Sequence, residues 1–173
     1  MRQQTLPDHY ETTRLILIPL NIQDAEFIRE LVNTPGWVQF IGQRNVHSKE
    51  DAIAYIRKII DSPAVKYWVV KLKSENTSVG VVTFMKKDYL PHHDLGFAFL
   101  PQYNKNGYAF EAAKEILTNM FKDPNHQQIV ATSRQGNVSS MKLLEKLGFK
   151  FQREYLNGED LLSVYVVSVS ALG

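Results

Sequence analysis

Apolar and β-branched residues recur in short runs along the chain, and polar stretches rich in Gly, Asn, Pro and Ser separate them. Such runs predict β-strands. The polar stretch 73–78 and the pair Asn157-Gly158 are connections of the kind that join the strands of a hairpin. The expected strands cover residues 14–20, 67–72, 79–85, 94–100, 128–133, 149–156 and 161–169.

Apolar residues at helical spacing predict two helices between the first and second strands. Asn21 has the side chain of a helix cap, and Pro35-Gly36 is expected to end this first helix before a loop over residues 37–41. Ser48 resembles the start of a capping box, and Pro63 closes the second helix.

The clearest helical pattern runs from Gly107 to Lys122. A last helix is expected to begin at Asn137 and to end at Gly148, where a left-handed backbone conformation suits glycine. The apolar positions of the 107–122 helix follow the spacing i, i+3, i+4, i+7, i+8, i+11 and i+12, at Ala109, Ala112, Ala113, Ile116, Leu117, Met120 and Phe121.

The order of elements is β-α-α-β-β-β-α-β-α-β-β. Strands joined by short turns pair antiparallel, whereas the two strands that flank the 107–122 helix can pair parallel through a right-handed crossover. The pattern therefore predicts a mixed, mostly antiparallel α/β sheet of about seven strands with helices on both faces. The length and the absence of a linker predict one domain over residues 1–173.

Composition excludes several classes of protein. The chain has no cysteine, so disulfides, thiolate zinc sites, iron–sulfur clusters and cysteine nucleophiles are ruled out. With 20 basic and 18 acidic residues the net charge is +2, which does not favour nucleic acid as a partner. His92-His93 has no further ligand at a suitable spacing, so no metal is expected. Residues 1–8 lack the apolar stretch of a signal peptide and no run is long enough to span a membrane, which predicts a cytoplasmic protein without a membrane partner.

The turn between the strand at 94–100 and the helix at 107–122 is a candidate anion site. A helix N-terminus presents unpaired N–H groups and the positive end of the helix dipole, which suit a phosphate or pyrophosphate. Gly107 allows a ligand to approach the backbone, and Lys105 adds a positive charge. Many α/β proteins have such a junction without a ligand, and the turn has neither a P-loop ending nor a dinucleotide fingerprint.

The stretch before the last helix is the second informative segment. Asn137 is by itself a helix cap, and Ser139 and Ser140 are then ordinary polar residues of the first turn. Taken together with the turn at 100–109, the chain resembles the GNAT superfamily of N-acetyltransferases, and within it the branch similar to ribosomal-protein N-terminal (alanine/serine) acetyltransferases. The matching motifs are Glu11 to Leu15, Asp94-Leu95-Gly96-Phe97, Asn104 with Gly107 and Ala109, Asn137 with Ser140, and Glu145 to Phe149.

The resemblance implies a GNAT fold whose sheet splays between its fourth and fifth strands, where acetyl-CoA binds. Backbone groups near Phe99 and Leu100 would pair with the pantetheine arm, and a backbone N–H near Phe99 would polarise the thioester carbonyl. Asn137 would hold the pantetheine or its neighbouring backbone. The pyrophosphate would be held by the loop Asn104, Lys105, Asn106, Gly107, Tyr108 and Ala109.

The resemblance also implies catalytic roles. Asp94 is the candidate base, directly or through water, because the usual Glu of the motif is one methylene longer. Many family members place a Tyr acid seven residues after the motif Asn, but Leu144 stands there in this chain. Ser140 matches the branch in which a serine hydroxyl lies near the sulfur of the leaving thiolate. For both Asp94 and Ser140 an ordinary structural role is the alternative.

The loop from Trp37 to Arg44 lies where this family builds acceptor sites. Trp37 and Phe40 would line an acceptor pocket, and Arg44 would meet an acidic acceptor, although each suits plain packing or a surface position as well. The acceptor is expected to be a primary amine, either a peptide N-terminus or a small molecule such as a polyamine or aminoglycoside. A non-catalytic module with the same fold that binds CoA or another protein is the other alternative, and strand edges near 149–169 allow a homodimer.

Overall fold

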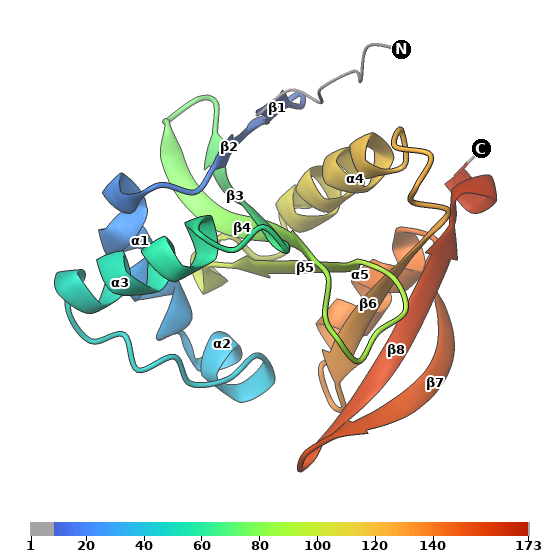
Figure 1. The fold of residues 1–173 in the computed structure, drawn as a ribbon. Helices are drawn as coiled ribbons and strands as arrows, with labels where there is room; N and C mark the ends of the chain where they lie inside the picture. Colours follow the sequence, from blue (N-terminus) through green and yellow to red (C-terminus); the bar gives the residue numbers. More distant parts are fainter. Residues whose placement is uncertain (1–8, 173) are drawn as a thin grey trace.

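The computed structural model describes residues 9–172, and the predictions for residues 1–8 lie outside this range. Its eight strands form one sheet in the order β1-β2-β3-β4-β5-β6-β8-β7 (Figure 1). All neighbouring strands pair antiparallel except β5 and β6, which are parallel. The strands are β1 (Tyr10–Glu11), β2 (Leu15–Pro19), β3 (Val65–Leu72), β4 (Thr77–Met85), β5 (Asp94–Phe99), β6 (Gln128–Arg134), β7 (Lys150–Asn157) and β8 (Asp160–Ser168).

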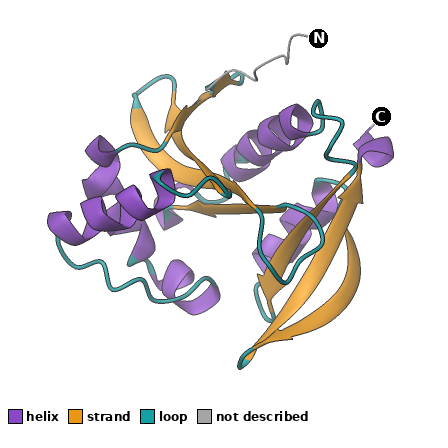
Figure 2. Ribbon diagram, viewed as in Figure 1, coloured by secondary structure: helices purple, strands orange, loops and turns teal. Residues whose placement is uncertain are grey.

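Helices cover both faces of this sheet, as the sequence predicts (Figure 2). Alternate residues of β3 point to opposite faces: Val69 packs with α1, α2 and α3, while Val70 packs with α4 and α5. The helices are α1 (Ala25–Val32), α2 (Pro35–Phe40), α3 (Lys49–Ile60), α4 (Tyr108–Met120) and α5 (Val138–Lys146), with 3₁₀ turns at Ile22–Asp24, Pro101–Tyr103 and Val169–Leu172.

Two local predictions were wrong. The segment expected as a loop after Pro35-Gly36 begins with the helix α2, because Thr34 accepts a hydrogen bond from the Trp37 N–H and Pro35 occupies the first helical turn. Proline is tolerated there since its missing N–H would have no partner in the helix. The strand β1 was not expected, because two residues carry no readable periodicity, and it brings the sheet to eight strands.

The sheet opens between β5 and β6. The two strands share one registered pair, Asp94 with Val130, whereas β4 and β5 share six. Beyond Asp94 the strands diverge, and Figure 1 shows β5 and β6 running in different directions. This is the splay that the GNAT resemblance predicts, and it leaves one edge of β5 open.

The far edge of the sheet is formed by β7, whose Phe151 and Leu156 are exposed. This edge is the one for which the sequence allows a homodimer, which stays a prediction. Within residues 9–172, no helix has both the length and the apolar character needed to cross a membrane.

Candidate active site

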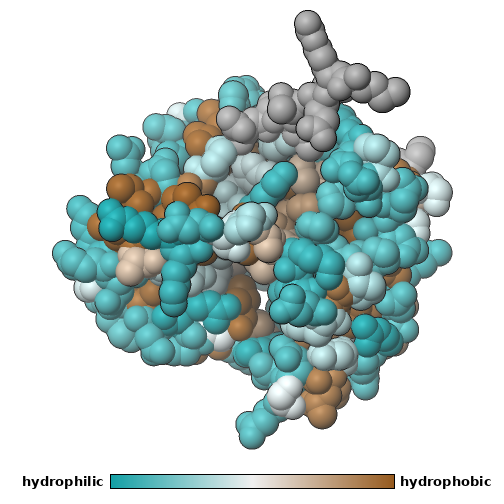
Figure 3. All heavy atoms as spheres, in the orientation of Figure 1, coloured by the Kyte–Doolittle hydropathy of each residue, from teal (hydrophilic) through white to brown (hydrophobic). Residues whose placement is uncertain are grey.

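A cleft of about 700 Å³ lies where β5 and β6 diverge. Residues of α2, the loop after it, β5, β6, the start of α4, α5 and the β7–β8 hairpin line it. Figure 3 shows the hollow between the two halves of the molecule, with hydrophobic side chains among hydrophilic ones. The predicted residues Trp37, Phe40, Arg44, Asp94, Phe99, Asn104, Ala109, Asn137 and Ser140 all line this cleft.

Asp94 is buried at the point where the two strands separate, with 5% of its surface exposed. Its Oδ2 lies 2.7 Å from the Lys87 Nζ. Its Oδ1 is buried and, among the described residues, has no hydrogen-bond partner of good geometry. Burial raises the pKa of the Asp94 carboxyl, and the charge and hydrogen bond of Lys87 act against this rise. The net result is a raised pKa for Asp94, and the positive charge of Lys87 limits the rise because it favours the carboxylate form.

Lys87 is a site residue that sequence reasoning missed. Burial is the largest single effect and lowers the pKa of Lys87, but the charge and hydrogen bond of Asp94, together with those of Tyr89, outweigh it, so the pKa is raised and the side chain stays an ammonium. In the structure Met85 pairs with Asp94, and the loop that follows β4 brings Lys87 back beside that residue. The loop itself has no periodic pattern that would have selected Lys87.

The turn before α4 has the geometry of an anion site. Gly107 has a φ of 79° and Lys105 a φ of 66°, so two residues of the turn are left-handed. No side chain of the described residues caps the N-terminus of α4. Lys105, Asn106 and Gly107 are exposed. Their N–H groups and those of the first helical turn are thus available to a ligand.

Arg14, the residue before β2, contacts this turn and was not selected as a site residue. Its Nη1 donates to the Asn106 carbonyl at 2.9 Å, and its Nε donates to Glu111 at 2.9 Å. The guanidinium also lies 4.5 Å from the centroid of the Tyr108 ring. The contacts join the turn to the sheet and hold the N–H groups of the turn in place.

The first turn of α5, which follows β6, lines the cleft on the β6 side. The Asn137 side chain accepts a hydrogen bond from the Ser140 N–H at 3.4 Å, so the helix-cap role of Asn137 is present. Ser140 is partly buried in the cleft wall. Leu144, at the position of the missing tyrosine, is buried and also lines the cleft.

The aromatic wall comes from α2 and β3. Trp37 is buried, and its Nε1 has no hydrogen-bond partner among the described residues. Arg44 lies 5.8 Å from the centroid of the Trp37 ring. Tyr67 also lines this part of the cleft, whereas Trp68 packs in the core against Tyr10.

Arg134 lines the cleft and contacts residues on both sides of it. Its Nη1 donates to the Gln39 carbonyl at the end of α2, and its Nη2 donates to Asp160 on β8, each at 2.9 Å. The Arg134 side chain thus joins the two halves of the molecule at a second place, apart from the pair Asp94–Val130.

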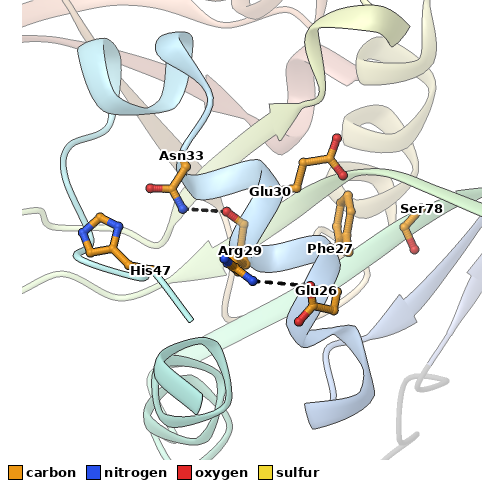
Figure 4. A pocket seen from close by; sticks show the side chains of 7 residues that line it. All are labelled: Glu26, Phe27, Arg29, Glu30, Asn33, His47 and Ser78. Atoms are coloured by element: carbon orange, nitrogen blue, oxygen red, sulfur yellow. Dashed lines mark hydrogen bonds and ion pairs between the residues drawn. The ribbon is translucent and has the colours of Figure 1, made fainter. Parts of the chain in front are cut away.

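Two other features lie outside the cleft. A hollow on the outer side of α1 is lined by Glu26, Phe27, Arg29, Glu30, Asn33, His47 and Ser78, none of which lines the cleft (Figure 4).

The second feature is a cluster of aromatic rings around His93. The His93 ring stacks on Phe84 with 4.9 Å between ring centroids and meets the edge of His126 at 4.7 Å. Burial lowers the pKa of both histidines, which fits rings packed as neutral aromatic groups. In residues 9–172, no group of three or more His, Cys, Asp or Glu is arranged to hold a metal.

Comparison with known proteins identifies the family. Residues 14–150 match the family described as Acetyltransferase (GNAT) domain. YnaD of Bacillus subtilis (strain 168), an uncharacterized N-acetyltransferase, is 31% identical over 144 residues, which cover 82% of this chain and 82% of that protein. The chain therefore belongs to the GNAT acetyltransferase family, and the prediction that it is an N-acetyltransferase is confirmed.

Solved structures confirm the predicted fold. A spermidine N-acetyltransferase from Vibrio cholerae, in complex with CoA and spermine, has a TM-score of 0.78 at 19% identity, over 94% of this chain and all of that chain. The ribosomal-protein-S5-alanine acetyltransferase from Vibrio fischeri also has a TM-score of 0.78 at 19% identity, over 92% of this chain and 96% of that chain. A spermidine acetyltransferase and a ribosomal-protein acetyltransferase share this fold, so the fold alone does not select the acceptor.

Proposed function

We propose that this protein moves an acetyl group from acetyl-CoA to a primary amine by direct attack within a ternary complex. The observation that carries the proposal is the open edge of β5, which begins at the buried Asp94 and leads to the turn with uncapped N–H groups before α4. An acyl thioester lying along this edge would have its phosphates at the turn and its reacting end in the cleft.

The hydrogen-bond pattern of β5 supports an extended ligand on this edge. The Leu100 N–H donates to the Val79 carbonyl on β4 at 2.9 Å. Because successive N–H groups of a strand point to opposite sides, the N–H and C=O of Phe99 point away from β4 toward the open edge. The pantetheine arm carries amide groups that would pair there as a neighbouring strand does. The Phe99 N–H is then the donor for the thioester carbonyl.

The turn from Asn104 to Ala109 would hold the pyrophosphate. Its support is the set of uncapped N–H groups at the start of α4, together with the charge of Lys105. Asn137 caps α5 through its side-chain oxygen, which leaves its amide nitrogen to donate to the pantetheine.

The reaction requires a neutral amine, and an alkyl amine with a pKa of about 10.4 is mostly protonated at neutral pH. The carboxylate form of Asp94, which the charge of Lys87 favours, takes the proton directly or through water. The amine nitrogen bonds to the acetyl carbon, the carbon–sulfur bond breaks, and CoA leaves as a thiolate. Ser140 donates a hydrogen bond to the developing thiolate, and no side chain becomes acetylated.

Replacement of Asp94 tests this function. We expect Asp94→Asn to lower kcat/KM for amine acetylation by about 100-fold or more, because a positioned general base contributes about this much. The Kd for acetyl-CoA should stay within about twofold, because the pantetheine and phosphate contacts lie elsewhere. CoA release and calorimetry measure the two quantities. Unchanged turnover in the variant would exclude Asp94 as the base.

A further inference from the structure

The acceptor side of the cleft has more positive charge than its carboxylates can balance. Asp94 and Asp160 are the carboxylates that line the cleft in the described part of the chain. Both are already paired, Asp94 with Lys87 at 2.7 Å and Asp160 with Arg134 at 2.9 Å. Arg44 lines the same cleft and has no carboxylate within 4.0 Å among residues 9–172.

The two arginines of this wall converge on one backbone position. A Cβ at Gly42 would lie 3.2 Å from the Arg44 Nη1 and 3.5 Å from the Arg134 Nη2. Arg44 is exposed, and its own hydrogen bonds are long, at 3.4 Å to the Gly42 carbonyl and 3.5 Å to the Gln43 carbonyl. Long bonds to neighbouring carbonyls are weak, so the guanidinium retains donors for a ligand.

The neighbouring polar groups of this wall are also hydrogen-bond donors. The Trp37 Nε1 donates only and has no acceptor in the described structure. Burial raises the pKa of Tyr67 well above its ordinary value, the neighbouring Tyr55 phenol and its hydrogen bond act in the same direction, and the charge of Arg44 acts in the opposite direction, so the Tyr67 phenol keeps its proton. A ligand that supplies oxygen acceptors matches this wall, and one that supplies further ammonium groups does not.

We propose that the acceptor is an amine that also carries a carboxylate, which Arg44 binds beside Gly42. The proposal rests on the proposed function, since it names the acceptor class of the same site. A polyamine or aminoglycoside would bring several cations into a cleft whose carboxylates are both paired, and desolvating them there without new partners is unfavourable. An acidic peptide N-terminus and a small amino acid share the required chemistry.

The experiment measures kcat/KM for CoA release with matched acceptors. Two short peptides, amidated at the C-terminus, begin with Ala-Glu or Ala-Lys, so the side chain at the second position is their one difference in charge. Free glutamate represents the small amino acids, and spermidine and kanamycin represent polycations. We expect the Ala-Glu peptide or glutamate to exceed the Ala-Lys peptide, spermidine and kanamycin by about tenfold or more, as a charged hydrogen bond would provide. The ratio of the peptide to glutamate distinguishes the two sources of the carboxylate.

Arg44→Glu should reverse this preference, with a loss of about tenfold for the acidic acceptor and a gain for the Ala-Lys peptide. Arg57→Glu is the matched control, because it makes the same change in net charge on an exposed residue that does not line the cleft. Preference of the wild type for the basic acceptors, or an equal effect of Arg44→Glu on both peptides, would overturn the acceptor class alone. Absence of turnover with every acceptor would overturn the proposed function, and the acceptor class with it.

Discussion

The carboxylate of Asp94 is subject to two opposing effects. Burial raises its pKa, while the Lys87 ammonium at 2.7 Å lowers it. Without the lysine, the buried carboxyl group would stay protonated up to a higher pH. In its protonated form it cannot accept a proton from an amine. The ion pair between Lys87 and Asp94 therefore bears on catalysis, because it widens the pH range in which the Asp94 carboxylate is available as a base.

Replacement of Lys87 tests this balance. Lys87→Met removes the charge that lowers the Asp94 pKa, so that pKa should rise further. Because activity requires the carboxylate, it is lost as the pH falls through the Asp94 pKa, and this acid limb of the kcat/KM profile should move to higher pH. Lys87→Arg is the control that keeps the charge. An acid limb at the same pH in Lys87→Met would contradict the role of the lysine.

Sequence reasoning named the candidate site residues that stand in motifs, and it did not name the side chains that contact them in the structure. Asp94 and Asn137 stand in recognisable short patterns next to predicted elements. Lys87 and Arg14 act through side-chain positions that depend on how a loop and a distant strand pack, and local sequence does not encode that packing. The Asn137 cap was visible because a cap interacts with its own helix.

At the scale of elements, the turn before α4 depends on a backbone conformation that side chains disfavour. Gly107 has a φ of 79°, and a Cβ there would meet the flexible end of Arg14 at 3.3 Å. Neighbouring atoms leave some space, so the conformation itself is the main obstacle to other residues.

We expect Gly107→Val to abolish the rise in Tm that acetyl-CoA causes. The β-branched side chain disfavours the left-handed conformation by about 1–2 kcal/mol and also occupies the approach to the N–H groups of the turn. Gly158→Val is the matched control: Gly158 has a φ of 64°, no atom lies within 4 Å of its added Cβ, and it belongs to the β7–β8 hairpin. Thermal shift assays compare the variants. A full acetyl-CoA effect in Gly107→Val would rule out this turn as the phosphate site.

The main elements were predictable because their patterns are long. The strands and the helices α3, α4 and α5 carry several repeats of their own periodicity. The helix α2 was missed because Pro35-Gly36 is a common end signal, and in this chain Pro35 begins a helix that Thr34 caps. Two-residue strands such as β1 are defined by their partner and not by their own sequence.

For the whole molecule, the decisive feature is that the sheet is continuous but open at one place. The halves on either side of the opening are joined by the pair Asp94–Val130, by the crossover through α4 and by the contacts of Arg134. The splay was expected from the family resemblance and not from the strand pattern, because periodicity reports which face a strand buries and not where two strands part.

Amide hydrogen exchange tests whether acetyl-CoA lies along this opening. The Phe97 and Phe99 N–H groups point to the open edge, so they should exchange fast in the free protein and at least about tenfold more slowly with acetyl-CoA. The Leu100 N–H, which already donates to Val79, is an internal control and should change little. NMR resolves these amides. Equal exchange of Phe99 with and without acetyl-CoA would contradict pairing along β5.

The single pair that joins β5 to β6 also contains Asp94. This residue lies at the pivot about which the two halves of the sheet would turn, so a change in the angle between the strands moves β6 relative to the carboxylate while the carboxylate itself moves least. Substitutions in the far parts of either half would then alter how the acceptor and acetyl-CoA approach each other without displacing Asp94. Selection could adjust the width of the cleft for different amines while the chemistry at the pivot stays unchanged.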